Sequence, residues 1–190
     1  MEKNRIESFS DGVLAIIITI MVLQLGIPTS AELSALYPVI PIFLGYMLSF
    51  IYVGIYWNNH HHLLKTLHTV SGKILLVNLV LLFWVSLMPF TTAWMAENYF
   101  EAWPTVFYGI VLLMASISYY FLQREIIKIE GKDSDIKKAI GHKDKEKISC
   151  IFYIIAISIA LFEPHISQIL YLAVALIWII PDRRIEEILE

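Results

Sequence analysis

Residues 5–23 read RIESFSDGVLAIIITIMVL, a short polar segment that leads directly into a strongly apolar run. No charged residue follows Asp11 until position 32. Because a helix needs about 20 apolar residues to cross the hydrocarbon core of a bilayer, the run predicts a transmembrane helix over 9–26. A carboxylate at the membrane edge is costly unless it is paired or hydrated, which makes Asp11 a functional candidate. The alternative is an acidic residue that the helix dipole favours near a helix N-terminus.

The composition of the whole chain agrees with a membrane protein. Of its 190 residues, 58% are hydrophobic and only 16% are charged, with a mean hydropathy of +0.68. Soluble domains have about 45–50% apolar and about 25% charged residues, so membrane lipid is the expected surrounding. A net charge of −3 offers no basic field for nucleic acid. The single cysteine, Cys150, excludes an intramolecular disulfide.

Five further segments are free of Asp, Glu, Lys and Arg. Trimmed to the length of a bilayer crossing, the segments predict an all-α integral membrane protein with six transmembrane helices, all in one channel-type domain that covers residues 1–190. The fifth and sixth are short and form a hairpin. The expected spans are 9–26, 36–58, 73–94, 103–123, 147–162 and 166–181, with a solvated cytoplasmic loop over 124–146.

The positions of the basic residues test this division. All 14 Lys and Arg residues precede the first span, follow the sixth, or lie in the loops after the second and fourth spans and at the first residue of the span that follows each loop. The other three loops carry acidic residues instead: Glu32, Glu97, Glu101 and Glu163. Because cytoplasmic loops hold the excess of Lys and Arg, both termini are predicted to be cytoplasmic in a multi-pass protein of the cell membrane.

One stripe of the first helix carries residues of unusual variety. At 100° per residue, Gly12, Ile16, Thr19 and Leu23 share a face, and Asp11 lies about 100° away from it. Around a symmetry axis such a stripe would form rings of a small residue, aliphatic side chains and a hydroxyl. Periodicity alone favours the other interpretation, a dry contact between helices.

The second span ends in a polar collar, Trp57-Asn58-Asn59-His60-His61-His62. Neighbouring residues on a helix point about 100° apart, so three consecutive histidines are poor metal ligands, and no metal site is predicted. Hydrogen bonds from Asn58, Asn59 and one or two histidines to a neighbouring helix are the better hypothesis. Asn78, in the third span, is a candidate for the same kind of contact.

The segment Arg5…Phe9-Ser10-Asp11-Gly12, continuing into the Ile/Val/Leu-rich helix, resembles the signature of the transmembrane protein 175 family. This family comprises endolysosomal potassium channels and their prokaryotic relatives. The number of spans and the collar after the second span also resemble a single-repeat prokaryotic member. The resemblance covers the whole chain, although only the first helix carries a sharp motif.

The resemblance implies a homotetramer in which the first helix of each subunit lines a central pore. The family lacks the Thr-Val-Gly-Tyr-Gly filter of other potassium channels, and so does this sequence. By position from the Phe-Ser-Asp motif, Ile16 corresponds to the narrowest hydrophobic ring. Thr19 corresponds to a hydroxyl ring linked with potassium preference, and Leu23 to a further apolar layer. Gly12 begins the same pore face.

The resemblance also implies a structural network between the first helix and the collar of the second. Which of His60, His61 and His62 joins it is left open by the sequence, and His61 is taken as the candidate. The members assigned to this network are Arg5, Phe9, Ser10, Asp11, Trp57, Asn58 and His61.

The sequence therefore predicts a passive potassium-permeable channel with a hydrophobic constriction, transient K⁺ in its pore and no cofactor. The alternatives are a secondary transporter, a proton-conducting membrane protein and, third, a membrane enzyme. No span has an acidic or basic residue at its centre, which argues against proton-coupled transport. An enzyme needs a cluster of catalytic side chains at one depth, and only His60–His62 approaches one.

Overall fold

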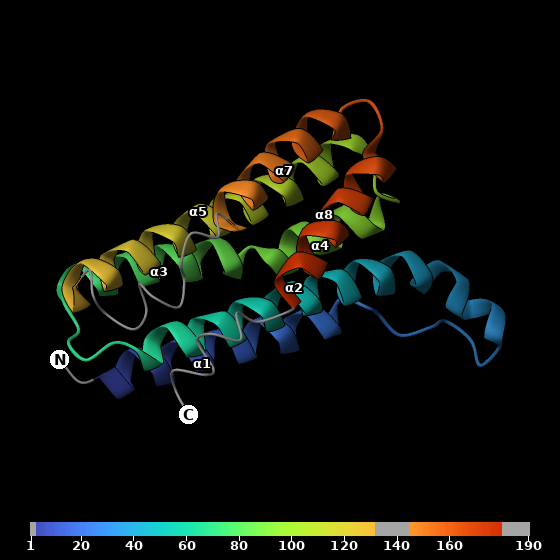
Figure 1. The fold of residues 1–190 in the computed structure, drawn as a ribbon. Helices are drawn as coiled ribbons and strands as arrows, with labels where there is room; N and C mark the ends of the chain where they lie inside the picture. Colours follow the sequence, from blue (N-terminus) through green and yellow to red (C-terminus); the bar gives the residue numbers. More distant parts are fainter. Residues whose placement is uncertain (1–2, 132–144, 180–190) are drawn as a thin grey trace.

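The computed structural model describes residues 3–131 and 145–179, and these form helices and connecting segments without a β-strand (Figure 1). The basic residues predicted in the loop over 132–144, and Arg183 and Arg184, lie outside the described residues. The elements are α1 (Lys3–Leu23), the 3₁₀ helix η1 (Leu33–Val39), α2 (Ile40–Lys65), α3 (Gly72–Ser86), α4 (Met88–Glu97), α5 (Ala102–Glu130), α7 (Lys145–Ala160) and α8 (Pro164–Ile179).

Several helices extend beyond the predicted spans at the end rich in Lys and Arg. α1 begins at Lys3 rather than at 9, α2 continues to Lys65 rather than 58, and α5 continues to Glu130 rather than 123. Hydropathy marks only the part of a helix that lies in lipid, whereas backbone hydrogen bonding continues through polar residues. α5 stops at Gly131, whose φ of +99° suits glycine in the left-handed region. The first part of the predicted loop over 124–146 is therefore helical.

The third predicted span is not one continuous helix. α3 ends at Ser86 and α4 begins at Met88, with Pro89 in the first turn of α4. Proline has no N–H to donate, and its ring clashes with the carbonyl four residues earlier. Pro41 likewise stands in the first turn of α2.

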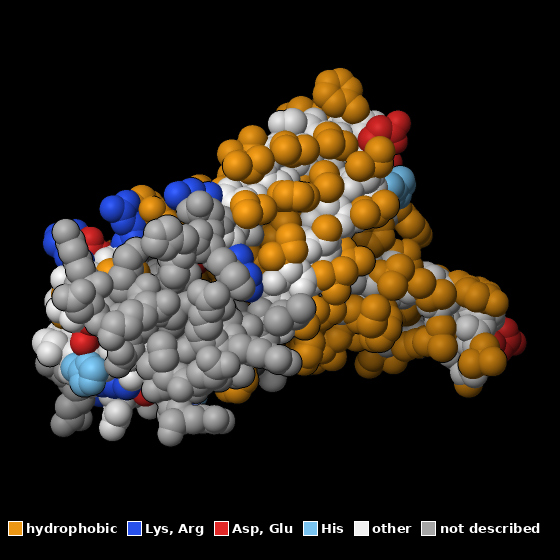
Figure 2. Space-filling view, viewed as in Figure 1, with side chains coloured by type: hydrophobic (Ala, Val, Ile, Leu, Met, Phe, Trp, Pro, Cys, Tyr) orange, Lys and Arg blue, Asp and Glu red, His pale blue; other side chains and the backbone are white. Residues whose placement is uncertain are grey.

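Four helical segments are long and apolar enough to cross a membrane: Lys3–Leu23, Leu33–Lys65, Gly72–Glu97 and Ala102–Glu130. α7 and α8 have 16 residues each, or about 24 Å of helix, and α8 reaches the edge of the described chain. Hydrophobic side chains predominate on the right-hand part of the face in Figure 2. The prediction of an all-α, multi-pass membrane protein is confirmed.

Contacts between helix ends establish that the segments alternate in direction. The Lys73 ammonium, at the start of α3, donates to the Glu125 carboxylate near the end of α5 at 2.8 Å. Trp178, at the end of α8, donates from Nε1 to Ser149 Oγ at the start of α7 at 2.7 Å. Figure 2 shows the Lys and Arg side chains of this face gathered at one end of the molecule, the end where α1 begins in Figure 1.

The centre of the subunit contains hydrogen-bonded tyrosines from α2, α5, α7 and α8. Tyr52 donates to the Tyr171 carbonyl oxygen, and Tyr171 donates from its hydroxyl to the Thr105 carbonyl oxygen at 3.2 Å. Gly109 allows this packing, because a Cβ there would collide with the Tyr171 hydroxyl. α5 is thus enclosed by its own subunit.

Candidate pore helix and its anchor on α2

α1 has one face buried in the subunit and one face exposed. The buried residues are Ile6, Ser10, Leu14, Ile17 and Met21. They recur every three or four residues and so form one side of the helix. The stripe predicted from the sequence lies on the other side, and every member of it is exposed.

The exposed stripe consists of Gly12, Ile16, Thr19 and Leu23. Ile16 is 58% exposed and Leu23 is 79% exposed. Soluble monomers rarely expose large aliphatic side chains in one continuous patch. Thr19 donates its hydroxyl hydrogen to the Ile16 carbonyl oxygen at 2.8 Å. That bond leaves the oxygen lone pairs of Thr19 free, and lone pairs are what a cation requires.

The buried face of α1 carries a polar chain that runs to α3 and α2. Ser10 donates from Oγ to the Ile6 carbonyl oxygen at 2.8 Å and accepts from Asn78 Nδ2 at 3.0 Å. The Asn78 Oδ1 atom lies 2.7 Å from His60 Nε2, so His60 donates to it in the Nε2–H tautomer. All three side chains are 2% exposed or less. His60 is therefore the histidine connected to Ser10, and Asn78 is the interhelical contact expected of it.

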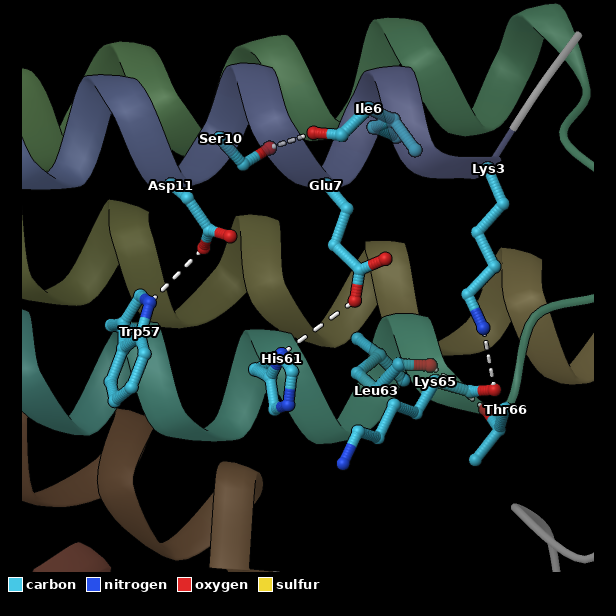
Figure 3. Close-up of polar contacts among 10 residues, drawn as sticks. All are labelled: Lys3, Ile6, Glu7, Ser10, Asp11, Trp57, His61, Leu63, Lys65 and Thr66. Atoms are coloured by element: carbon cyan, nitrogen blue, oxygen red, sulfur yellow. Dashed lines mark hydrogen bonds and ion pairs between the residues drawn. The ribbon is translucent and has the colours of Figure 1, made fainter.

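A second set of contacts, which we call the α1–α2 ladder, joins the two helices along their polar ends (Figure 3). Its three rungs repeat every four residues along both antiparallel helices. They are Lys3 Nζ donating to the Lys65 carbonyl oxygen at 2.8 Å, Glu7 Oε1 at 3.6 Å from His61 Nδ1, and Trp57 Nε1 donating to Asp11 Oδ1 at 3.0 Å.

The structure does not bring all the predicted network residues together. Arg5 and Phe9 are exposed, and among the described residues Arg5 makes no hydrogen bond or ion pair. The Asn58 side chain is half-buried and makes no hydrogen bond to another described residue, whereas the Asn59 side chain donates to the Ile55 carbonyl oxygen. The ladder and the buried chain include Ser10, Asp11, Trp57 and His61.

The sequence analysis did not assign Lys3 and Glu7 to this anchor. A signal was present, because polar residues at 3, 7 and 11 match polar residues at 57, 61 and 65, each set spaced by four. Two antiparallel helices that each carry such a row can pair them rung by rung. The sequence alone does not specify the register between the two helices, and the pairing of the two rows depends on that register.

A groove lies beside the C-terminal half of α1. Its volume is about 660 Å³, and it is lined by Ile16 and Ile20 of α1 and by Phe90 and Trp94 of α4. The buried Oε1 atom of Gln24 in this groove has no hydrogen-bond partner. Among the described residues, no three His, Cys, Asp or Glu side chains lie close enough to hold a metal ion.

These features define a multi-pass, all-α membrane protein whose first helix exposes an apolar stripe. Residues 5–89 match the family model described as "Endosomal/lysosomal potassium channel TMEM175". A protein of Chryseobacterium sp. named a potassium channel is 54% identical over 190 residues, which cover 100% of this chain and 99% of that protein. The chain belongs to the TMEM175 family, whose members named here are ion channels and not enzymes.

More distant relatives match about half of the chain's length. A Streptomyces collinus protein named a potassium channel is 35% identical over 100 residues, 50% of this chain and 48% of that protein. The human "Endosomal/lysosomal proton channel TMEM175" is 32% identical over 101 residues, only 20% of its own length.

A solved structure has the same fold. The crystal structure of a lysosomal potassium-selective channel TMEM175 homolog from Chamaesiphon minutus superimposes with a TM-score of 0.82 at 24% identity, covering 95% of this chain and 98% of that one. The resemblance found in the first helix therefore extends to the arrangement of the whole subunit.

Proposed function

We propose that this protein is a passive, potassium-permeable cation channel, assembled as a homotetramer with α1 of each subunit around a central pore. The observation that carries the proposal is the exposed stripe of α1 in a member of an ion-channel family. The relative that matches the chain over its full length bears the name of a potassium channel.

The exposure of the stripe supports an assembly around an axis. The opposite face of α1 is already buried in its own subunit through Leu14, Ile17 and Met21. A ring of identical subunits would cover the flanks of each α1 and leave Gly12, Ile16, Thr19 and Leu23 facing the axis. Closed rotational symmetry is the usual arrangement of homo-oligomers, and the family resemblance implies four subunits.

Permeation through such a pore would depend on the width of an aliphatic ring. Four Ile16 side chains around the axis exclude water when they are close together, so the ring blocks ions by dewetting. The lone pairs of four Thr19 oxygens would replace part of the hydration shell of an ion. K⁺ gives up its water more easily than Na⁺, and without a cage of carbonyl groups the preference for K⁺ is modest.

The charge distribution supports an orientation with both termini in the cytoplasm. Lys3, Lys65 and Lys73 lie at one end of the helices, where Glu125 also lies. At the opposite end, Glu97 is the last residue of α4 and Glu163 lies between α7 and α8. The end that carries Lys and Arg faces the cytoplasm in most membrane proteins. We place the protein in the cell membrane on this basis.

Proton conduction is the second candidate, because the vertebrate relatives are named proton channels. One recording tests both functions. Purified protein is reconstituted in a planar bilayer with KCl on one side and NaCl on the other, and the reversal potential is measured. A reversal toward the K⁺ equilibrium potential supports the potassium channel. A reversal that instead follows a pH gradient supports the proton channel, and a current that depends on neither cation excludes both.

A further inference from the structure

The middle rung of the α1–α2 ladder differs from the other two, because both of its side chains can change charge. We propose that Glu7 and His61 are positioning residues that hold α1 against α2 through an ion pair, and that protons on the Lys-rich side of the membrane set its strength. The functional consequence rests on the proposed function, in which α1 lines the pore.

The geometry of the rung suits an ion pair that protons can reach. His61 Nδ1 lies 3.6 Å from Glu7 Oε1, with the two side chains 34% and 21% exposed. This distance is too long for a neutral hydrogen bond but within the range of a charge pair. The His61 ring stacks on Trp57 with ring centroids 6.1 Å apart and planes 18° apart, so the imidazole is fixed in front of the carboxylate.

The neighbouring rungs keep their charge when His61 changes its own. Lys3 donates to a backbone carbonyl oxygen, and the indole of Trp57 donates to Asp11 without titrating. His60 is buried and bonded to Asn78, on the other side of α2. Among the described residues of α1 and α2, the other titratable groups beside His61 are Asp11, His62 and Lys65. The His61 and His62 ring centroids lie 5.8 Å apart.

The sign of the pH effect follows from the charges. Protonation at lower pH makes an imidazole cationic, and the cation attracts the Glu7 carboxylate. At higher pH the ring is neutral and the attraction is lost. Acidification on this side therefore strengthens the attachment of α1 to α2, and alkalinisation weakens it.

The rung lies directly before the pore-lining stripe. Glu7 precedes Gly12, the first stripe residue, by little more than one helical turn. Any movement of this end of α1 away from α2 must break the rung. An exposed ion pair changes an equilibrium by about twofold, and four pairs that break together multiply this to more than about tenfold.

The first experiment records single channels in a planar bilayer while the pH on the Lys-rich side is stepped from 8 to 6. We expect one of the two mean dwell times, open or closed, to lengthen on acidification, by about twofold to more than about tenfold. Glu7→Gln and His61→Gln should each remove this dependence. His61→Lys, which stays charged, should give the acidic dwell time at every pH.

The chain offers a matched control at the same end of the molecule. His68 Nδ1 lies 2.8 Å from Glu130 Oε2, a second histidine–carboxylate pair that does not touch α1. His68→Gln should retain the pH dependence of the wild type. The proposal is overturned if the wild-type dwell times do not change with pH, or if the dependence persists in both Glu7→Gln and His61→Gln.

A measurement without current separates this inference from the proposed function. For the purified protein in detergent, the thermal unfolding temperature is measured at pH 6 and at pH 8. The increase from pH 8 to pH 6 should be larger for the wild type than for Glu7→Gln measured in parallel. If the protein passes no current but shows this difference, the ion pair is supported and the proposed channel function is contradicted. If the protein conducts but wild type and Glu7→Gln respond to pH alike, the channel function is supported and the ion-pair proposal is contradicted.

Discussion

α1 and α5 are both apolar helices, but the subunit encloses them very differently. In their most apolar stretches, 28% of α1 is buried inside the subunit, compared with 61% of α5. α5 packs against α3 and α7, and its Gly109 admits the Tyr171 hydroxyl from α8. α1 has neighbours on one side only. The comparison teaches that α5 completes the fold of one subunit, whereas α1 presents a surface that one subunit does not use.

The same contrast exists along α1 itself. Its first turns are attached to α2 by the ladder, and to Asn78 of α3 through Ser10. Its last turns face the groove beside α4 and contribute only the back-bonded hydroxyl of Thr19 as a polar group on the stripe. An anchored N-terminal end and a groove beside the C-terminal half are compatible with the proposed pore helix, whose constriction would have room to change width.

The largest expected effect is a loss of unfolding free energy that differs between substitutions at two adjacent residues, one on each face of α1. Ile17 is 4% exposed and Ile16 is 58% exposed. Ile17→Asn should cost about 2–5 kcal/mol of unfolding free energy, because it removes a buried aliphatic side chain and buries an amide. Ile16→Asn should leave stability within about 0.5 kcal/mol and, by wetting the ring, raise conductance and lower the K⁺ over Na⁺ preference.

Thermal unfolding in detergent and bilayer recording measure the two effects of this pair. If both variants unfold at the same temperature, the two faces of α1 are not distinct. If Ile16→Asn carries the wild-type current, Ile16 does not form the constriction.

A smaller effect on stability is expected when alanine replaces a glycine of α5 or a glycine of α1. A Cβ at Gly109 would lie 2.7 Å from Ile157 Cγ1 and closer still to the Tyr171 hydroxyl, whereas a Cβ at Gly12 meets nothing within 4 Å. Gly109→Ala should cost up to about 2 kcal/mol, the difference between overpacking of about 1–3 kcal/mol and a gain of about 1 kcal/mol in helix propensity.

Gly12→Ala is the control for this substitution. It has the same gain in helix propensity without a clash inside the subunit, so its unfolding temperature should equal or exceed that of the wild type. Equal destabilisation by both substitutions would contradict the difference in packing between α1 and α5.

The smallest effect is expected from the hydroxyl of Thr19. Thr19→Val keeps the shape of the side chain and removes the oxygen that faces away from the subunit. The K⁺ to Na⁺ permeability ratio, obtained from reversal potentials, should fall by about two- to fivefold, the equivalent of one weak polar contact. Ser158, an exposed hydroxyl on α7 that donates to its own helix, is the control, and Ser158→Ala should change nothing. An unchanged ratio in Thr19→Val would remove Thr19 from the selectivity of the pore.

Much of the fold was predictable because the signals are local. The transfer of an apolar helix into lipid depends on its own residues, so hydropathy located the helical segments. The predicted spans are several residues shorter than the helices at their polar ends. Proline chemistry is also local, yet the break at Leu87 was missed. A helix interior and a helix start both accommodate Pro89 in the sequence, and neighbouring helices decide between them.

Less of the anchor was predictable. Asp11 and Asn78 were recognised as polar groups in need of partners, because a polar group in a membrane protein is costly alone, whereas Ser10 and Trp57 were assigned through the family resemblance. Glu7 was missed, and Arg5, Phe9 and Asn58 were assigned to a network whose described contacts do not include them.

The sequence by itself determined a multi-pass α-helical protein, its alternating charge and the four residues that share a stripe on α1. These follow from composition and from a fixed turn of 100° per residue. Only the tertiary structure decided that the stripe faces outward, and that His60 meets Asn78 while His61 meets Glu7. Adjacent histidines point in different directions, and the rotation and register of two packed helices depend on contacts from residues far apart in the chain.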